Sequence, residues 1–441
     1  MRNIFAAAVL SICVTSLYAG GAVIEQKDGK SETAYSIELE TISGVSWSKA
    51  RNNPGAKVDL WNVEHVKYNG KGMDEYNGLA RKLAAGRGKE LAEHADLYLK
   101  MAAAPQGVDD ESWARVKLAC RYYRGQGLAM TGQDDAAVDE LDGFIKDAEA
   151  QAVEGGLNLK FTSAVSSKPV AKAGGLHRLY LDGLEALGLA LLRKGESAKA
   201  TDTAFKALEE ISKELASKSG KNQYFNWALR ALRVSARYAE DRKEYAAARQ
   251  AYESLAKVAL QKEGGRASRA SNEASLRVGF MQIKEGDVRG ASSRFFEAIR
   301  EWEAAYGPAH DPNTNPPAFK PNWITPDISY RAAGAYVGQG MVEAAQARNS
   351  QQWAKALKNF CTSLAIFDAD DEIRSMGLLG AANAAAQLAE QSKGNAVVAS
   401  NYAKLAEKYL AELTGLFGKS KAAEDDQIAV IQSHIRTYKK D

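Results

Sequence analysis

The feature that most constrains this chain is a helical periodicity that begins near residue 73 and persists almost to Asp441. After Gly70, Lys71 and Gly72 the sequence becomes rich in Ala, Leu, Lys and Glu. Apolar residues recur at about 3.6 positions, which gathers them on one face of each helix, and that face must be buried against another helix. The sequence therefore predicts a mainly α-helical domain over residues 73–441.

Helical pairs recur within this domain. Each clear pair has a glycine in its first helix, a glycine at the turn and an alanine early in its second helix. These residues are Gly188, Gly195 and Ala200 in one pair, Gly279, Gly286 and Ala291 in another, and Gly125 in the first helix of a third. Small residues let helices approach closely, and glycine suits a sharp reversal. The pattern resembles the tetratricopeptide repeat.

That resemblance implies an α-solenoid of stacked helical hairpins with an extended face that binds a protein or peptide, usually as a scaffold. The units are spaced more widely than the roughly 34 residues of the standard repeat, so an irregular α-solenoid is expected. Any Ala- and Leu-rich helical hairpin also carries small residues where helices cross. The repeat interpretation is preferred because the glycine, turn and alanine spacing recurs in three units.

Residues 22–70 have a period of two instead. Five short strands are predicted, separated by turns at Asp28-Gly29 and Asn53-Pro54-Gly55. The pattern resembles a small SH3-like or Sm-like barrel, through its strand count and the segment 62–68. The side chains expected in its core are those of Ile24, Ile37, Leu39, Val45, Trp47 and Val66. This module is either a second interaction domain or a cap on the first repeat.

The first 19 residues have the organisation of a secretory signal peptide. Arg2 is followed by an apolar run from Ile4 to Tyr18, and Ala19 begins a stretch of small residues. The sequence therefore predicts an exported protein, periplasmic or secreted, with cleavage after Ala19. The alternative of a lipoprotein modified at Cys13 is disfavoured because bulky Ile12 precedes it.

Charge and hydropathy exclude two classes of partner. No later segment has the roughly 18–20 uninterrupted apolar residues of a membrane helix, so stable membrane insertion is not expected. The formal net charge is +3, and removing residues 1–19, which contain Arg2 as their only charged residue, leaves +2. Near-neutrality argues against a nucleic-acid partner. The sequence does not define an oligomeric state.

Catalytic motifs are absent from the sequence. The five histidines lie far apart, and there is no HExxH, CxxC or phosphate-binding loop. Paired aspartates such as Asp109-Asp110 and Asp370-Asp371 directly precede helical runs, where they are expected to cap helices. We therefore predict no catalytic residue, metal or cofactor, and a protein that is not an enzyme. Cys120 and Cys361 are interpreted as buried free thiols, with a disulfide between them as the alternative.

Two groups of residues are candidates for partner binding. Arg230, Arg233 and Arg237 lie on one face of a predicted helix and suggest either an anionic ligand or a solvated solenoid face.

The segment 307–327 contains six of the nine prolines, which oppose helix formation. Phe319 and Trp323 within it, and Tyr330 after it, are aromatic residues of the kind enriched at interfaces. They either bind a partner or fasten the segment onto the helical surface.

Two other functions remain open. Trp227, Trp302, Trp323 and Trp353 could stack on sugars, as in an exported carbohydrate-binding helical protein. Alternatively, His310 and Asp311 could belong to an active site on the helical scaffold, because a fold does not exclude catalysis. A non-catalytic scaffold that binds a protein or peptide is the preferred hypothesis.

Overall fold

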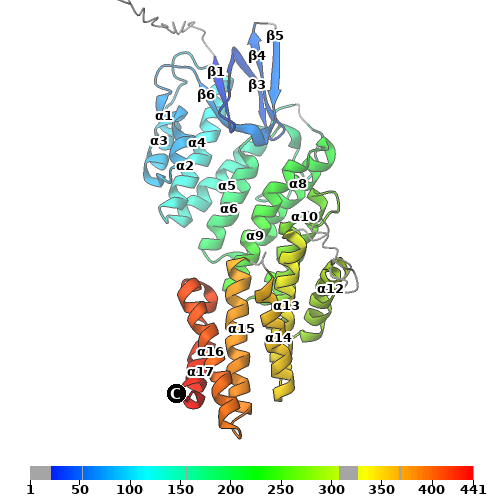
Figure 1. Cartoon of the computed structure of the whole chain (residues 1–441). Coiled ribbons are helices and arrows are strands. Elements are labelled where there is room, and N and C mark those ends of the chain that lie inside the picture. Colours follow the sequence, from blue (N-terminus) through cyan, green and yellow to red (C-terminus); the bar gives the residue numbers. More distant parts are fainter. Residues whose placement is uncertain (1–20, 52, 155–156, 307–325, 367–369, 441) are drawn as a thin grey trace, which may run out of the picture. The chain divides into compact units, whose positions relative to one another are not determined.

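The computed structural model describes residues 21–51, 53–154, 157–306, 326–366 and 370–440 (Figure 1). They form two compact units that meet between Ala231 and Leu232, inside helix α9 (Phe225–Asp241). The protein is mainly α-helical, built from helical hairpins that follow a small β region, as the sequence predicts. The predicted leader and most of the Pro-rich segment lie outside the described residues.

The β region contains six strands where the sequence predicts five. They are β1 (Ala22–Gln26), β2 (Ser31–Ala34), β3 (Ser36–Thr41), β4 (Gly44–Ala50), β5 (Asn53–Val58) and β6 (Val63–Tyr68). Two antiparallel three-stranded sheets result, in the orders β2-β1-β6 and β3-β4-β5. The additional strand arises at Tyr35, where the chain leaves the first sheet and enters the second, so that one predicted strand becomes β2 and β3.

The alternation of buried side chains in β3 changes at a register shift. Ile37 is buried opposite Trp47, as expected, but the pairing with β4 shifts between Ile37 and Leu39. Because a shift of one residue exchanges the two faces of a strand, Leu39 is only partly buried and Glu40 becomes a core residue. A carboxylate therefore lies inside the β region where a leucine is predicted.

The first unit continues with helices that pack against their neighbours in sequence. Their bounds are α1 (Asp74–Asn77), α2 (Leu79–Ala84), α3 (Gly88–Lys100), α4 (Asp110–Met130), α5 (Asp134–Ala150), α6 (Tyr180–Arg193), α7 (Ser197–Lys199) and α8 (Lys206–Ser219). A π-helical turn, Ala200–Phe205, joins α7 to α8. In this unit α3 packs on α4, α4 on α5 and α5 on α6.

A buried ionic cluster connects the β region to these helices. Glu40 accepts hydrogen bonds from Arg178, just before α6, and from the hydroxyl of Tyr68 in β6. Both members of the Glu40–Arg178 pair are buried. Burial alone would raise the pKa of Glu40, but the charge of Arg178, together with His177 and Tyr68, holds that pKa well below its usual range. The cluster therefore keeps a charged carboxylate in the core of this unit.

Backbone contacts strengthen the same connection. Arg115 of α4 donates to the carbonyl of Ile37 at 3.0 Å, and the Ile42 N–H donates to the Leu176 carbonyl at 2.9 Å. The hydroxyl of Tyr224 donates to the Ile42 carbonyl at 3.0 Å. Because these bonds satisfy backbone groups along the β3 edge, the β region and the helices of the first unit share one core.

The second unit is entirely helical in its described residues. Its helices after α9 are α10 (Tyr245–Lys262), α11 (Arg269–Glu285), α12 (Val288–Tyr306), α13 (Pro326–Gln346), α14 (Ser350–Ala365), α15 (Asp371–Gln391), α16 (Ala396–Phe417) and α17 (Gln427–Tyr438). A 3₁₀ turn, η7 (Lys421–Glu424), precedes α17. Hairpins α13/α14 and α15/α16 pack side by side, and α17 folds back onto α15 and α16.

Helix α13 is rich in Gly and Ala, and about half of its residues are buried, as in α15. A Cβ on Gly334 would lie 2.4 Å from Leu276 of α11 and 3.3 Å from Ile373 of α15. The absence of a side chain at Gly334 thus lets both α11 and α15 approach α13 closely. None of the helices in the described part of the chain is both long and apolar enough to cross a membrane.

Candidate functional site

The second unit contains a groove of about 830 Å³. Helices α11, α13, α14 and α15 contribute to its walls, and the segment 420–430, which contains η7 and the start of α17, forms a further wall. A volume of this order is typical of sites that accept several side chains or a small ligand. We refer to it as the α11–α17 groove.

Apolar and thioether side chains dominate the inner surface of the groove. They are Phe280, Met281 and Ile283 from α11, Met341 from α13, Trp353 and Phe360 from α14, Met376 and Leu379 from α15, and Val430 from α17. Val430 is 50% exposed and Met376 is partly exposed, so apolar surface is presented to solvent. Methionine adapts its shape to different apolar partners, so this surface can follow the contour of a bound segment.

Glycines determine the depth of the groove at its centre. A Cβ placed on Gly340 or on Gly380 would lie within 3 Å of the ring of Phe360. The ring therefore occupies the space that side chains at these two positions would fill. A larger residue at either position would displace Phe360 from its present place in the groove wall.

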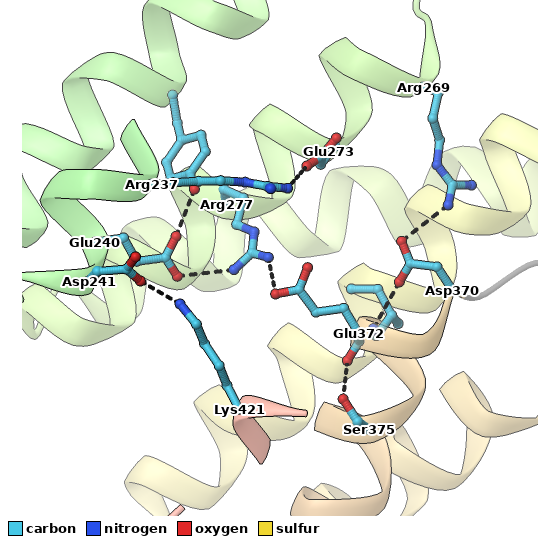
Figure 2. Close-up of polar contacts among 12 residues, drawn as sticks. Arg237, Glu240, Asp241, Arg269, Glu273, Arg277, Asp370, Glu372, Ser375 and Lys421 are labelled. Atoms are coloured by element: carbon cyan, nitrogen blue, oxygen red, sulfur yellow. Dashed lines mark hydrogen bonds and ion pairs between the residues drawn. The ribbon is translucent and has the colours of Figure 1, made fainter. Parts of the chain in front are cut away.

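One end of the groove carries a bridge of ionic contacts, drawn in Figure 2. Arg277 of α11 donates to Glu240 of α9 at 3.0 Å and pairs with Glu372 of α15 through its other terminal nitrogen. Burial would lower the pKa of Arg277, but the two carboxylates raise it, so the guanidinium stays charged. The Tyr252 hydroxyl donates to Glu240 at 2.7 Å and orients it. Arg277 thus links three helices across the groove end.

A second ionic contact attaches the C-terminal wall. Lys421 of η7 pairs with Asp241 at the end of α9, and Figure 2 shows its side chain extended toward that carboxylate. The two side chains are 80% and 58% exposed. Exposed pairs of this kind contribute about 0–1 kcal/mol. The segment 420–430 is therefore held mainly by packing of η7 and α17 on α15 and α16.

Several polar groups in the groove lack an ion-pair partner or a side-chain hydrogen bond within the described ranges. Asp371 has no cation, Lys284 has no carboxylate, and the side-chain amides of Asn383 and Gln387 make no hydrogen bond. Asp425 also has no cation, but it accepts a hydrogen bond from the Gln427 N–H at 2.9 Å. Asn383 and Gln387 lie one turn apart on α15, so both amides project from the same face of the helix. Unpaired donors and acceptors beside an apolar surface are available to a ligand.

The three predicted arginines all lie on α9, where carboxylates contact each of them. Arg230, in the first unit, pairs with Glu185 at 2.7 Å and lies over the ring of Trp227. In the second unit Arg237 pairs with Glu273 at 3.3 Å, and Arg233 approaches the same carboxylate at 3.8 Å. Each arginine is therefore already engaged by a carboxylate of its own unit.

The predicted aromatic group is divided in the same way. Phe319 and Trp323 lie outside the described residues, as do His310 and Asp311. Tyr330 lies in α13 and is only 3% exposed, with the guanidinium of Arg269 over its ring. This cation–π contact and the Arg269–Asp370 ion pair join α11, α13 and α15 beside the groove.

The residues predicted to shape the hairpins occupy close contacts and turns. A Cβ on Gly125, Gly188 or Gly279 would lie within 3 Å of Leu141, Phe205 or Phe295 of the following helix. Gly195 and Gly286 adopt φ of +81° and +87° at the turns. Ala200 and Ala291 are fully buried early in the second helices.

Other chemical groups in the described chain serve structure. Asp109 and Asp370 accept hydrogen bonds from the backbone N–H groups three residues ahead, as N-caps do. Cys120 and Cys361 are free thiols, the first buried and the second partly exposed. Among the described residues, no group of three or more His, Cys, Asp or Glu side chains could hold a metal ion.

Sequence reasoning missed the α11–α17 groove because its walls come from helices that are far apart in the chain. Arg277 and Glu372 belong to different predicted repeats, and nothing in their local sequences pairs them. The methionines and aromatic residues of the groove follow the same helical spacing as core residues. The only signal was the cluster of small residues in the segment 332–345, which marked a helix with close neighbours.

The fold and the groove define a class, a helical-hairpin repeat protein with a small β region. No family model and no curated protein matches the sequence. The solved structures similar to it include the apo form of RapI, with a TM-score of 0.42, 10% identity, and coverage of 83% of this chain and 84% of that chain. A circular tandem repeat protein with novel repeat topology gives a TM-score of 0.25, 15% identity, and coverage of 83% and 87%. Both scores are too low to bear on function.

Proposed function

We propose that this protein is a non-catalytic interaction scaffold of the tetratricopeptide-like kind that binds a segment of a protein partner in the α11–α17 groove. The observation that carries the proposal is the groove itself. A cavity of about 830 Å³ combines an apolar surface with the unpaired amides of Asn383 and Gln387 and the unpaired carboxylate of Asp371. Apolar contact supplies affinity, and a few placed polar groups fix the orientation of a ligand.

Site-specific photo-crosslinking tests this assignment. A photoreactive amino acid is placed at Asn383, and the full chain is irradiated in its native extract before mass spectrometry of the products. Ala345→Trp fills the groove from an exposed position on α13, whereas Ala354→Trp adds the same side chain on an exposed position of α14 outside the groove. We expect one protein to be crosslinked in the parent and the Ala354→Trp chain, and lost with Ala345→Trp. Equal crosslinking in all three chains would refute the groove as the binding site.

Export and cleavage after Ala19 are part of the same proposal, supported by the order of Arg2, the apolar run and the small residues. N-terminal sequencing of the protein purified from its native source tests them. A mature chain that begins at Gly20 supports export with the expected cleavage, and an intact Met1 contradicts it.

Carbohydrate binding is the second function that an observation favours. Trp353 lines the groove beside the amides of Asn383 and Gln387, whereas Trp227 is 5% exposed and donates to Asp182. An aromatic ring with nearby amides suits a sugar. If a glycan array gives binding that Ala345→Trp abolishes while photo-crosslinking captures no protein, the groove binds carbohydrate instead.

A further inference from the structure

We propose that the segment bound in the α11–α17 groove is basic and amphipathic, with bulky apolar side chains on one face and Lys or Arg on the other. This inference rests on the proposed function and adds the chemistry of the partner. It follows from the sign of the charge around the groove, from its apolar surface, and from the state of its ion pairs.

The groove is acidic although the chain as a whole is not. Three cations line it, namely Arg277, Lys284 and Lys421, and four carboxylates line it, namely Glu240, Asp371, Glu372 and Asp425. Lys421 is paired with a fifth carboxylate, that of Asp241 beside the groove. Carboxylates in the lining therefore exceed cations by one, whereas the whole chain has a formal net charge of +3. A local excess of charge opposite in sign to the chain selects a partner of complementary sign.

The ion pairs show which carboxylates carry the excess negative charge. Arg277 is shared by Glu240 and Glu372, so one cation serves two carboxylates. Asp371 and Asp425 have no cationic partner in the described part of the chain. A ligand cation near Arg277 would complete this arrangement, whereas a ligand carboxylate would add a further negative charge to it.

The apolar surface defines the other face of the ligand. Met281, Met341 and Met376 lie on three different helices, and Trp353 and Phe360 of α14 line the same groove. Such a surface accepts large apolar side chains at helical or extended spacing. A basic peptide without apolar side chains would leave this apolar surface exposed to water. The ligand is therefore expected to have both basic and apolar side chains.

Three synthetic peptides distinguish the charge inference from the groove assignment. Each has about 18 residues, enough for five helical turns, with the same Leu and Met face. The opposite face carries Lys in the first peptide, Glu in the second and Gln in the third. Fluorescence anisotropy of the labelled peptides is measured with the full chain, at low and at high ionic strength.

We expect the Lys peptide to bind at least about tenfold more tightly than the Glu peptide at low salt, with the Gln peptide between them. The difference should shrink as salt screens the exposed charges. Ala345→Trp should weaken all three peptides, because it fills the groove, and Ala354→Trp should leave them unchanged.

A matched pair of variants assigns the preference to the groove. Asp371 and Asp110 both occupy the first position of a helix after an aspartate N-cap, but only Asp371 lines the groove. Asp371→Asn should reduce the preference for the Lys peptide by about twofold to fivefold, and Asp110→Asn should not change it.

The outcomes separate the two proposals. If the Gln and Glu peptides bind as tightly as the Lys peptide and Ala345→Trp weakens all three, the groove assignment stands and the charge inference is wrong. If the Lys peptide binds equally well to the Ala345→Trp chain, its binding is a surface attraction and the inference is also wrong. If no peptide binds, the charge inference fails, and the crosslinking experiment decides the groove assignment separately.

Discussion

The two units use the same chemical pair, an arginine with a glutamate, for different purposes. In the first unit Glu40 and Arg178 have almost no exposed side chain, and they join the β region to the helices. In the second unit Arg277 and Glu372 are 12% and 47% exposed and lie along a groove. The buried pair fixes a fold, because removing one partner strands a charge in the core. In the second pair the carboxylate of Glu372 is half-exposed, and Arg277 has a second partner in Glu240, so the loss of Glu372 does not leave a buried charge alone.

The contrast between the two ion pairs is tested most strongly by removing one carboxylate from each pair and measuring the loss of stability. Glu40→Ala leaves the Arg178 guanidinium buried without its partner, and we expect it to destabilise the first unit by about 3–5 kcal/mol. Glu372→Ala removes a half-exposed carboxylate and leaves Arg277 paired with Glu240, so its cost should be smaller, about 1 kcal/mol. Hydrogen exchange measured by mass spectrometry reports each unit separately. Similar losses from both variants would contradict the contrast.

Acidification should also destabilise the first unit at a higher pH than the second. Burial lowers the pKa of His65 in the first unit from 6.5 to about 3, and the charge of Arg178 adds to this effect. Between these values the unfolded chain binds a proton that the folded chain does not, so stability decreases as pH falls from about 6.5 to 3.

The depressed pKa of Glu40 acts in the same direction below its ordinary value of 4.5. We expect the first unit to lose protection against hydrogen exchange, relative to the intrinsic exchange rate at each pH, before the second unit does as pH is lowered. His65→Gln, which cannot titrate, should reduce the dependence. A second unit that loses protection first would contradict the assignment.

A second comparison of the two units concerns one glycine in each that is packed against an aromatic ring. A Cβ on Gly188 in the first unit, or on Gly380 in the second, would lie 2.3 Å from the ring of Phe205 or Phe360. Overpacking costs about 1–3 kcal/mol, partly offset by roughly 1 kcal/mol from the helix propensity of Ala. We therefore expect Gly188→Ala and Gly380→Ala to lower the free energy of unfolding by about 1 kcal/mol each, measured in urea.

Ligand binding distinguishes the same two variants. Only Gly380→Ala should weaken the Lys peptide, because Phe360 lines the groove and Phe205 does not. Loss of binding with Gly188→Ala at unchanged stability would show that the groove is not the site.

The smallest expected effect concerns the two thiols. Burial raises the pKa of Cys120 in the first unit well above its ordinary value. Cys361 is partly exposed, with its sulfur 3.2 Å from the Tyr409 hydroxyl. Since the thiolate reacts and the buried thiol does not ionise, a thiol-specific reagent should label Cys361 first in the native chain. Full labelling of both thiols after denaturation is the control, and earlier labelling of Cys120 would contradict its burial.

Local chemistry made much of the fold predictable. The spacing of Gly188, Gly195 and Ala200 anticipated a helical hairpin, because close approach and a positive φ demand small residues wherever they occur. The β region was less predictable, since alternation assumes an unbroken register. One shift in β3 places Glu40 in the core and leaves Leu39 partly exposed. No pattern in the segment 36–41 indicates that shift.

The groove depends on relations that a single sequence does not display. Trp353 and Met376 have the spacing of core residues, and only the packing of their helices leaves them partly exposed. Arg230, Arg233 and Arg237 are visible as a stripe, but Glu185 and Glu273, which engage them, belong to other helices. Periodicity predicts which face of a helix is apolar. It does not predict whether a neighbouring helix covers that face completely or leaves part of it exposed.

The wall formed by residues 420–430 and the packed hairpins beside it should differ in how freely their residues can be substituted. The repeated hairpins α13/α14 and α15/α16 carry the core, so substitutions there are constrained by packing. The segment after α16 lines the groove through a few side chains, such as Lys421 and Val430, and its ion pair with Asp241 is exposed. Under the proposed function, substitutions in this short segment would therefore change the surface offered to the partner without disturbing the packing of the hairpins.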